Sequence, residues 1–300
     1  MSRTIDAMLF PGNAGRMDYA YLDKKVADGA RGYEPMSADV EHLAVETALG
    51  TRVGVHVYRA SQPKPGQDPD VVIFNHGNVR PSRYMNDLLE QLAGNVRVEG
   101  RWLPENRKRT VIARDFVGYD MSTAVVNENG AMEVASQVND RAVYQWAVDQ
   151  FGHQPTTRFF VGGRSIGTNG WVNELGGERV AKAFGFVPYA FPAPLLRAGI
   201  VELARRVPVV GQVLAPLVGA LVGCLPLELA TARAFPAGVR PSAPHLHTLQ
   251  THGFTPATAI AACGESLAGK EVWLFPAERD ELVPSDAVPE LQARLMEAGA

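Results

Sequence analysis

Short apolar runs alternate with amphipathic helical patterns through most of this 300-residue chain, and this alternation restricts the fold more than any other feature. Runs that are apolar throughout are typical of strands buried on both faces of a sheet. The helical patterns between them supply the crossover connections that parallel strands require. The sequence therefore predicts an α/β fold, with a mostly parallel sheet and helices on both faces. The predicted central strands are Val71–Asn75, Thr110–Arg114, Arg158–Gly162, Ala183–Val187 and Glu271–Phe275.

A pair of half-buried strands is predicted ahead of this sheet, at His42–Glu46 and Val53–Tyr58. The segment between them contains Gly50 and supplies a turn. Helices are predicted where apolar residues recur at helical spacing. The predicted helices are Ser82–Leu92, a segment that includes Asp140–Asp149, Thr168–Leu175 and Pro289–Met296.

Composition excludes several classes of protein. With 46% hydrophobic and 20% charged residues, the chain is an ordinary folded protein. Its formal net charge of −3 supplies no overall field for a polyanion, so we expect no nucleic-acid partner. Its two cysteines, Cys224 and Cys263, cannot build a disulfide framework. The N-terminal residues lack the apolar region of a signal peptide, and we therefore expect a cytoplasmic location.

The longest uncharged apolar stretch is Val207–Leu227, which is long enough to nominate a membrane span. Pro208, Pro216 and Pro226 would break or end a helix there. We therefore predict a lid or cap insertion over residues 190–240, within one domain that spans residues 1–300. Contact of this stretch with lipid, which would make the protein membrane-associated, is the alternative.

The strongest chemical signal is the sequence Gly163-Arg-Ser-Ile-Gly167, which directly follows an apolar run. A sharp turn from strand to helix requires small residues on both sides of the serine, and it holds the Ser165 hydroxyl out at the carboxyl end of the sheet. The helix that follows directs its free N–H groups at developing negative charge. Ser165 is therefore the candidate nucleophile, and an incidental serine in a glycine-rich turn is the alternative.

A second signal, His76-Gly77-Asn78, follows the predicted strand Val71–Asn75. A loop at this place can supply one N–H group of an oxyanion hole, and its glycine lets the backbone approach a substrate closely. The backbone amides of Asn78 and Ile166 are therefore the candidate oxyanion donors. We expect His76 to fix the loop by hydrogen bonding rather than to act as a catalytic base.

Four motifs occur in an order that resembles the α/β-hydrolase superfamily, in particular its BEM46-like and ABHD-type serine hydrolases. The resemblance extends from about His42 to the C-terminus. It implies an α/β-hydrolase-type sheet and a serine nucleophile. The motifs are the His76 loop, Asp115-Phe-Val-Gly-Tyr-Asp-Met-Ser122, Gly163–Gly167 with Thr168, and Phe275-Pro-Ala-Glu-Arg-Asp280-Glu-Leu-Val-Pro284.

The resemblance assigns the catalytic acid to Asp280, which precedes Pro284 in the last motif. A carboxylate there would orient an imidazole and stabilise its charged form. The neighbouring acids Glu278, Glu281 and Asp286 are rival assignments, and a solvated acidic loop is the alternative to any catalytic role.

The sequence has no histidine at the position where the family has its general base. The family order is serine, acid and then histidine after one further strand, but no histidine follows Asp280. His245, His247 and His252 lie between the predicted lid and the acid, and one of them could replace the base. We expect these histidines to lie on the surface or in the lid. No cysteine or carboxylate is interleaved with them, so we expect no metal site.

Together these features predict a serine hydrolase that acts on an ester, thioester or lipid-like acyl bond, with Ser165 as nucleophile and no metal or organic cofactor. The predicted apolar lid suggests a hydrophobic substrate. The alternative is a catalytically impaired α/β-hydrolase-like protein that binds a lipid, a membrane or a protein partner. A third interpretation is a shortened form whose parent carries the final strand and histidine.

Overall fold

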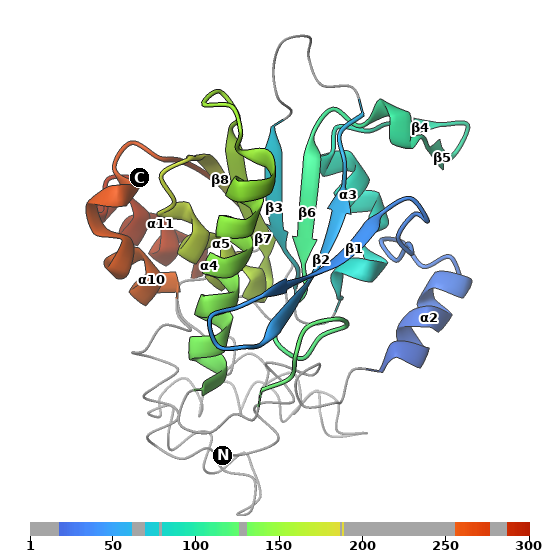
Figure 1. The fold of residues 1–300 in the computed structure, drawn as a ribbon, viewed down its shortest axis with the longest axis horizontal. Coiled ribbons are helices and arrows are strands. Elements are labelled where there is room, and N and C mark those ends of the chain that lie inside the picture. The colour runs from blue at the N-terminus through green and yellow to red at the C-terminus, as the bar shows by residue number, and fades with distance from the viewer. Residues whose placement is uncertain are drawn as a thin grey trace, which may run out of the picture.

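The computed structural model contains a central seven-stranded sheet covered by helices (Figure 1). It describes residues 18–61, 70–77, 80–125, 131–186, 188, 256–276 and 287–300. The predicted lid at 190–240 and the apolar stretch Val207–Leu227 lie outside the described residues, as does Val187. Among the described residues, no helix combines the length and the apolarity needed to cross a membrane.

The sheet has the strand order β1-β2-β6-β3-β7-β8-β9. The first pairings, β1 with β2 and β2 with β6, are antiparallel, and every pairing from β6 to β9 is parallel. The sheet is therefore mostly parallel, as the sequence predicts. The strands are β1 (Glu41–Glu46), β2 (Arg52–Tyr58), β3 (Val71–Asn75), β6 (Thr110–Arg114), β7 (Phe159–Arg164), β8 (Val180–Phe186) and β9 (Glu271–Phe275), and a separate antiparallel hairpin consists of β4 (Arg97–Val98) and β5 (Arg101–Trp102).

Side chains of the central strand β3 alternate between two apolar layers, because successive residues of a strand point to opposite faces. Val71 and Ile73 belong to the larger cluster, which includes residues of α4, α5, α10 and α11. Val72 and Phe74 belong to the smaller cluster, which includes Leu89 of α3. Helices therefore cover both faces, as predicted. The helices are α2 (Tyr19–Ala27), α3 (Asn86–Leu92), α4 (Ala131–Phe151), α5 (Thr168–Leu175), α10 (Pro256–Cys263) and α11 (Ala287–Glu297), with short 3-10 turns at η1 (Ser82–Tyr84), η2 (Pro104–Asn106), η3 (Ser165–Gly167) and η4 (Gly264–Leu267).

Several predicted elements are confirmed end to end, namely β3, β6, β9 and α5. Strand β7 is longer than predicted, because it continues through two glycines to Arg164 while paired with β8. The predicted helix Ser82–Leu92 is divided at Met85, whose φ of −115° is not helical. Sequence patterns did not identify α2, α10 or the β4–β5 hairpin.

Candidate active site

Ser165 lies in a tight turn at the carboxyl end of β7, where the strand passes into η3 and then into α5. Its φ is +51°, in the left-handed region that non-glycine residues rarely occupy. The backbone on either side of this turn is ordinary, since Arg164 before it is extended and Thr168 after it is helical. The Ser165 side chain is half-buried. A strained serine at a strand-to-helix turn is the geometry of a nucleophile elbow.

The two glycines of the motif are required because this turn packs directly against Asn75 of β3. A Cβ added at Gly167 would lie 2.2 Å from the Asn75 carbonyl oxygen, and one added at Gly163 would lie 2.8 Å from the same atom. Both distances are far below van der Waals contact, so neither position tolerates a side chain without movement of the backbone. The glycines therefore serve close packing of the elbow against β3.

The loop after β3 lies beside Ser165. A Cβ placed at Gly77 would be 3.8 Å from the Cβ atom of Ser165. This proximity matches the expectation that the loop contributes to the same site. Asn78, the predicted donor in this loop, lies outside the described residues. Ile166, the other predicted donor, lies in the η3 turn that leads into α5, where the first N–H groups have no helical acceptor.

His76 holds this loop in place and has no free nitrogen for catalysis. Its Nδ1 atom lies 2.7 Å from the Gly77 carbonyl oxygen, and its Nε2 atom accepts a hydrogen bond of 3.2 Å from the Phe116 amide. These partners require a neutral ring with the proton on Nδ1. Complete burial lowers the pKa of His76 to about 3. The expectation that His76 fixes the loop is confirmed.

The segment Asp115–Ser122 is a turn whose motif residues bond to one another. The Ser122 hydroxyl donates to the Asp115 carbonyl oxygen at 2.9 Å and accepts a hydrogen bond from the Gly54 amide. The Asp115 carboxylate accepts from the Met121 amide at 3.4 Å. Gly118 adopts a φ of +76°. These contacts give the motif a structural role next to His76.

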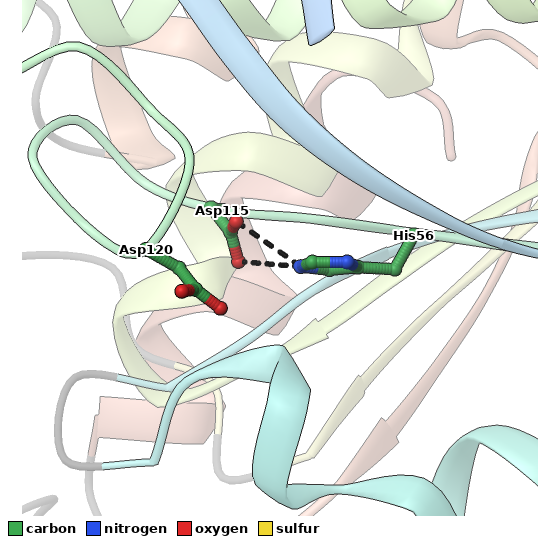
Figure 2. A group of neighbouring side chains, drawn as sticks. All are labelled: His56, Asp115 and Asp120. Atoms are coloured by element: carbon green, nitrogen blue, oxygen red, sulfur yellow. Dashed lines mark hydrogen bonds and ion pairs between the residues drawn. The ribbon is translucent and has the colours of Figure 1, made fainter. Parts of the chain in front are cut away.

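Figure 2 shows a group of titratable side chains in which Asp115 and Asp120 of this turn face His56. His56 Nε2 lies 3.1 and 3.2 Å from the two Asp115 carboxylate oxygens, while its Nδ1 lies 2.7 Å from Nδ1 of His42. Burial works to lower the pKa of His56, but the charge and hydrogen bond of Asp115 outweigh it, so that the pKa is raised. Burial raises the pKa of Asp115.

The His56, Asp115 and Asp120 side chains could in principle hold a metal ion, since their ligand atoms lie within 4.8 Å of one another. Each of them, however, already has a partner within the described chain. Asp120 accepts from Arg83 at 3.1 Å, and Asp115 bonds to His56 and to the turn. The observed contacts are sufficient to explain this group as a structural network.

A second buried polar cluster lies directly behind the elbow. Arg114, Asp140 and Glu174 are fully buried, and Arg114 is ion-paired with Asp140 and lies 4.0 Å from Glu174. Asn75 accepts from Arg114 and donates to Glu174 at 3.0 Å and to the Gly162 carbonyl at 3.1 Å. Two carboxylates thus face one guanidinium, and none of the three side chains has exposed surface. Burial raises the pKa of Glu174 to about 8, to which the nearby Asp140 charge adds while Arg114 opposes the shift.

Several predicted site residues cannot be located relative to Ser165. Asp280, its rivals Glu278, Glu281 and Asp286, and the histidines His245, His247 and His252 lie outside the described residues. The structure brings together Ser165, Ile166, Gly77 and His76. Sequence reasoning missed the Asn75–Arg114–Asp140–Glu174 cluster. The available signal was that two apolar runs each end in a polar residue, Asn75 in one and Arg114 in the other.

Comparisons with known proteins agree with the overall fold. The sequence matches no established family profile and no curated protein. An esterase from Pyrococcus furiosus has a similar structure, with a TM-score of 0.52 and 14% identity over 90% of this chain and 85% of the esterase chain. A second crystal form of that esterase gives a TM-score of 0.51 at 15% identity, over 87% of this chain and 79% of the esterase. The chain has an α/β-hydrolase-type fold. An epoxide hydrolase from Vigna radiata matches more weakly, with a TM-score of 0.35 at 16% identity over 49% of this chain and 40% of its own.

Proposed function

We propose that this α/β-hydrolase-type protein is a serine hydrolase that cleaves an acyl ester or thioester with Ser165 as nucleophile. The observation that carries the proposal is the left-handed φ of +51° at Ser165, at the carboxyl end of β7 and beside the Gly77 loop. Such strain persists only where the surrounding structure enforces it, and it clusters at functional sites.

The reaction proceeds in two steps, acylation of Ser165 and hydrolysis of the acyl-serine. The Ser165 oxygen bonds to the acyl carbon and its proton passes to the general base, which returns a proton to the departing alcohol or thiol. Water then attacks the acyl-serine, releasing the carboxylic acid and restoring the hydroxyl. The amides of Ile166 and Asn78 stabilise the negative oxygen that forms in both steps. Asp280 supports the base.

The general base is not identified, and the candidates to replace it are His245, His247 and His252, which precede Asp280 in the sequence. Among the described histidines, His76 is committed at both nitrogens, His56 is held by Asp115 and His42, and His153 is exposed. These observations direct the search for the base to the segment between the predicted lid and the acid.

Hydrolysis of a p-nitrophenyl ester tests the proposal. We expect turnover by the wild type and a loss of at least about a thousandfold in Ser165→Ala, since triad members typically contribute several orders of magnitude. Ser266→Ala, at an exposed serine in η4, is the matched control and should retain full activity. Separate Asn substitutions of His245, His247 and His252 should reveal one loss of similar size, with exposed His153→Asn unchanged. Equal rates in wild type and Ser165→Ala would refute the proposal.

A binding protein without catalysis is the second candidate, because the ring nitrogens of His76 and of His56 are already held by partners within the described residues. A serine that lacks its imidazole is not an activated nucleophile. This candidate predicts no turnover of any ester, together with a rise in Tm on addition of fatty acid or of lipid vesicles.

A further inference from the structure

Arg164 directly precedes Ser165, and its side chain extends along the loop that flanks the nucleophile. The position of a Cβ at Gly77 lies 3.8 Å from Cγ of Arg164 and 3.8 Å from Cβ of Ser165. Both side chains therefore leave the elbow over the same glycine. Arg164 is exposed, whereas Ser165 is half-buried. The Arg164 side chain thus begins beside Ser165, against the same glycine.

Arg80 brings a second positive charge to the same loop, three positions after Gly77. It is half-buried and donates a hydrogen bond from one terminal nitrogen to the Gly32 carbonyl. Its Nε is buried and has no hydrogen-bond partner in the part of the chain that the structure describes. Burial lowers the pKa of Arg80, and the positive charge of Arg164 lowers it further.

Within the described residues, neither arginine forms an ion pair with a carboxylate. Asp87 is the carboxylate whose charge acts on Arg80, but it lies 3.6 Å from Arg97 and accepts from Gln91. Two like charges without a counter-charge raise the free energy of the folded chain, the more so where one is partly buried. Among the described residues, this local positive charge contrasts with the net charge of −3 for the whole chain. An anionic ligand would remove the repulsion.

We propose that Arg80 and Arg164 form an anion-recognition site beside Ser165, and that the substrate is an ester whose acyl part carries a carboxylate or phosphate. This inference rests on the proposed hydrolase function and names its substrate class. A guanidinium presents paired donors that match the oxygens of either anion. Because Arg164 is contiguous with Ser165, to which the acyl group is bonded during the reaction, the anion belongs to the acyl side of the ester.

Matched esters test this inference. The p-nitrophenyl monoester of pimelic acid and p-nitrophenyl heptanoate have acyl chains of equal carbon number and differ in a terminal carboxylate. We expect kcat/KM to favour the anionic ester by about tenfold, as a charge-assisted hydrogen bond can supply, and to lose this preference as salt rises. The analogue with a terminal phosphonate distinguishes the two anions, since it is the better substrate only if the site is built for phosphate.

Variants assign the preference to the arginines. Arg164→Gln should abolish most of the anionic-to-neutral ratio, Arg164→Glu should invert it, and Arg164→Lys should restore part of it. Arg80→Gln should lower the ratio as well, with Arg80→Lys as its conservative partner. Arg158→Gln is the control, because Arg158 is an exposed arginine at the amino end of the same strand, paired with Asp70. A ratio that is equal in wild type, Arg164→Gln and Arg158→Gln would overturn the inference.

Binding separates this inference from the proposed function. The Ser165→Ala protein cannot turn over an ester through this serine, so its Kd for monomethyl pimelate and for methyl heptanoate can be measured by calorimetry. Tighter binding of the anionic ester that disappears in Ser165→Ala with Arg164→Gln supports the anion site even if no ester is hydrolysed. Equal Kd values for the two esters refute the anion site even if Ser165 proves to be the nucleophile.

Discussion

The two ends of the central parallel strands differ in how they hold charge, although the strands have the same apolar interior. At the amino ends, Arg158 and Asp70 form a two-point ion pair of 2.8 and 3.0 Å, with the arginine side chain 58% exposed. At the carboxyl ends, Arg114, Asp140 and Glu174 interact with no exposed surface at all. Water screens the first set of charges and is excluded from the second.

This difference indicates what each end contributes. An exposed ion pair between the amino ends of two neighbouring strands contributes little to the free energy of unfolding. A buried charged cluster costs desolvation energy that apolar residues would not, and it is therefore weak evidence for stability. The carboxyl-end cluster instead fixes Asn75, which hydrogen-bonds to Glu174 and packs against Gly163 and Gly167 of the elbow. We infer that its role is to hold the elbow that contains Ser165.

The largest expected effect comes from breaking the buried cluster. Arg114→Leu leaves Asp140 and Glu174 buried without their cation, and we expect it to lower the free energy of unfolding by about 3 to 5 kcal/mol. Arg158→Gln, at the opposite strand end, should cost less than about 1 kcal/mol. Urea denaturation of the two variants measures both values. Equal losses at the two ends would remove the distinction drawn between them.

A smaller effect is expected from crowding the elbow. In Gly167→Ala the new methyl group would lie 2.2 Å from the Asn75 carbonyl oxygen, so we expect a loss of about 1 to 3 kcal/mol. The backbone itself is compatible with alanine, since Gly167 has a φ of −60°. Gly50→Ala measures the other kind of cost, that of backbone conformation alone. Gly50 has open space for a methyl group but a φ of +70°. A Gly167→Ala protein as stable as the wild type would show that the elbow is not held against β3.

A change in pH dependence is expected from the buried carboxyl of Glu174. The folded-state pKa of Glu174 is about 8, above its ordinary value, so this carboxyl contributes stability that is complete at acidic pH and is lost as pH rises toward 8. Glu174→Gln should therefore flatten the decline in unfolding free energy between about pH 5 and pH 8. Urea denaturation across this range measures it, with exposed Glu178→Gln as control. An unchanged slope in Glu174→Gln would show that Glu174 is ionised in the folded protein.

Most of the sheet could be predicted because strands buried on both faces have an unmistakable pattern. Val71–Asn75 and Thr110–Arg114 are apolar runs bounded by polar residues, and both strands have these limits in the structure. The turn at Ser165 could also be predicted from the sequence, because glycine on both sides of a serine indicates a tight turn. Helix α2 was missed because a single one of its residues, Leu22, is buried, which leaves too little apolar periodicity.

The polar clusters could not be predicted, because they depend on contacts between residues far apart in the sequence. Arg114 and Asp140 come from a strand and a helix, and only packing decides that they meet. His56 of β2 contacts Asp115, which follows the end of β6. In the sequence His56 is an isolated histidine within an apolar strand, and nothing there indicates this partner. The positions of Asn78 and Asp280 remain predictions from the motifs.

The most direct test of the central claim is covalent labelling of the purified protein with a fluorophosphonate, followed by mass spectrometry of its peptides. A strained and activated serine should react at Ser165 alone, and labelling should disappear in Ser165→Ala while Ser266→Ala reacts like the wild type. Absence of labelling in the wild type, or a label on another residue that persists in Ser165→Ala, would contradict the assignment of Ser165 as the nucleophile.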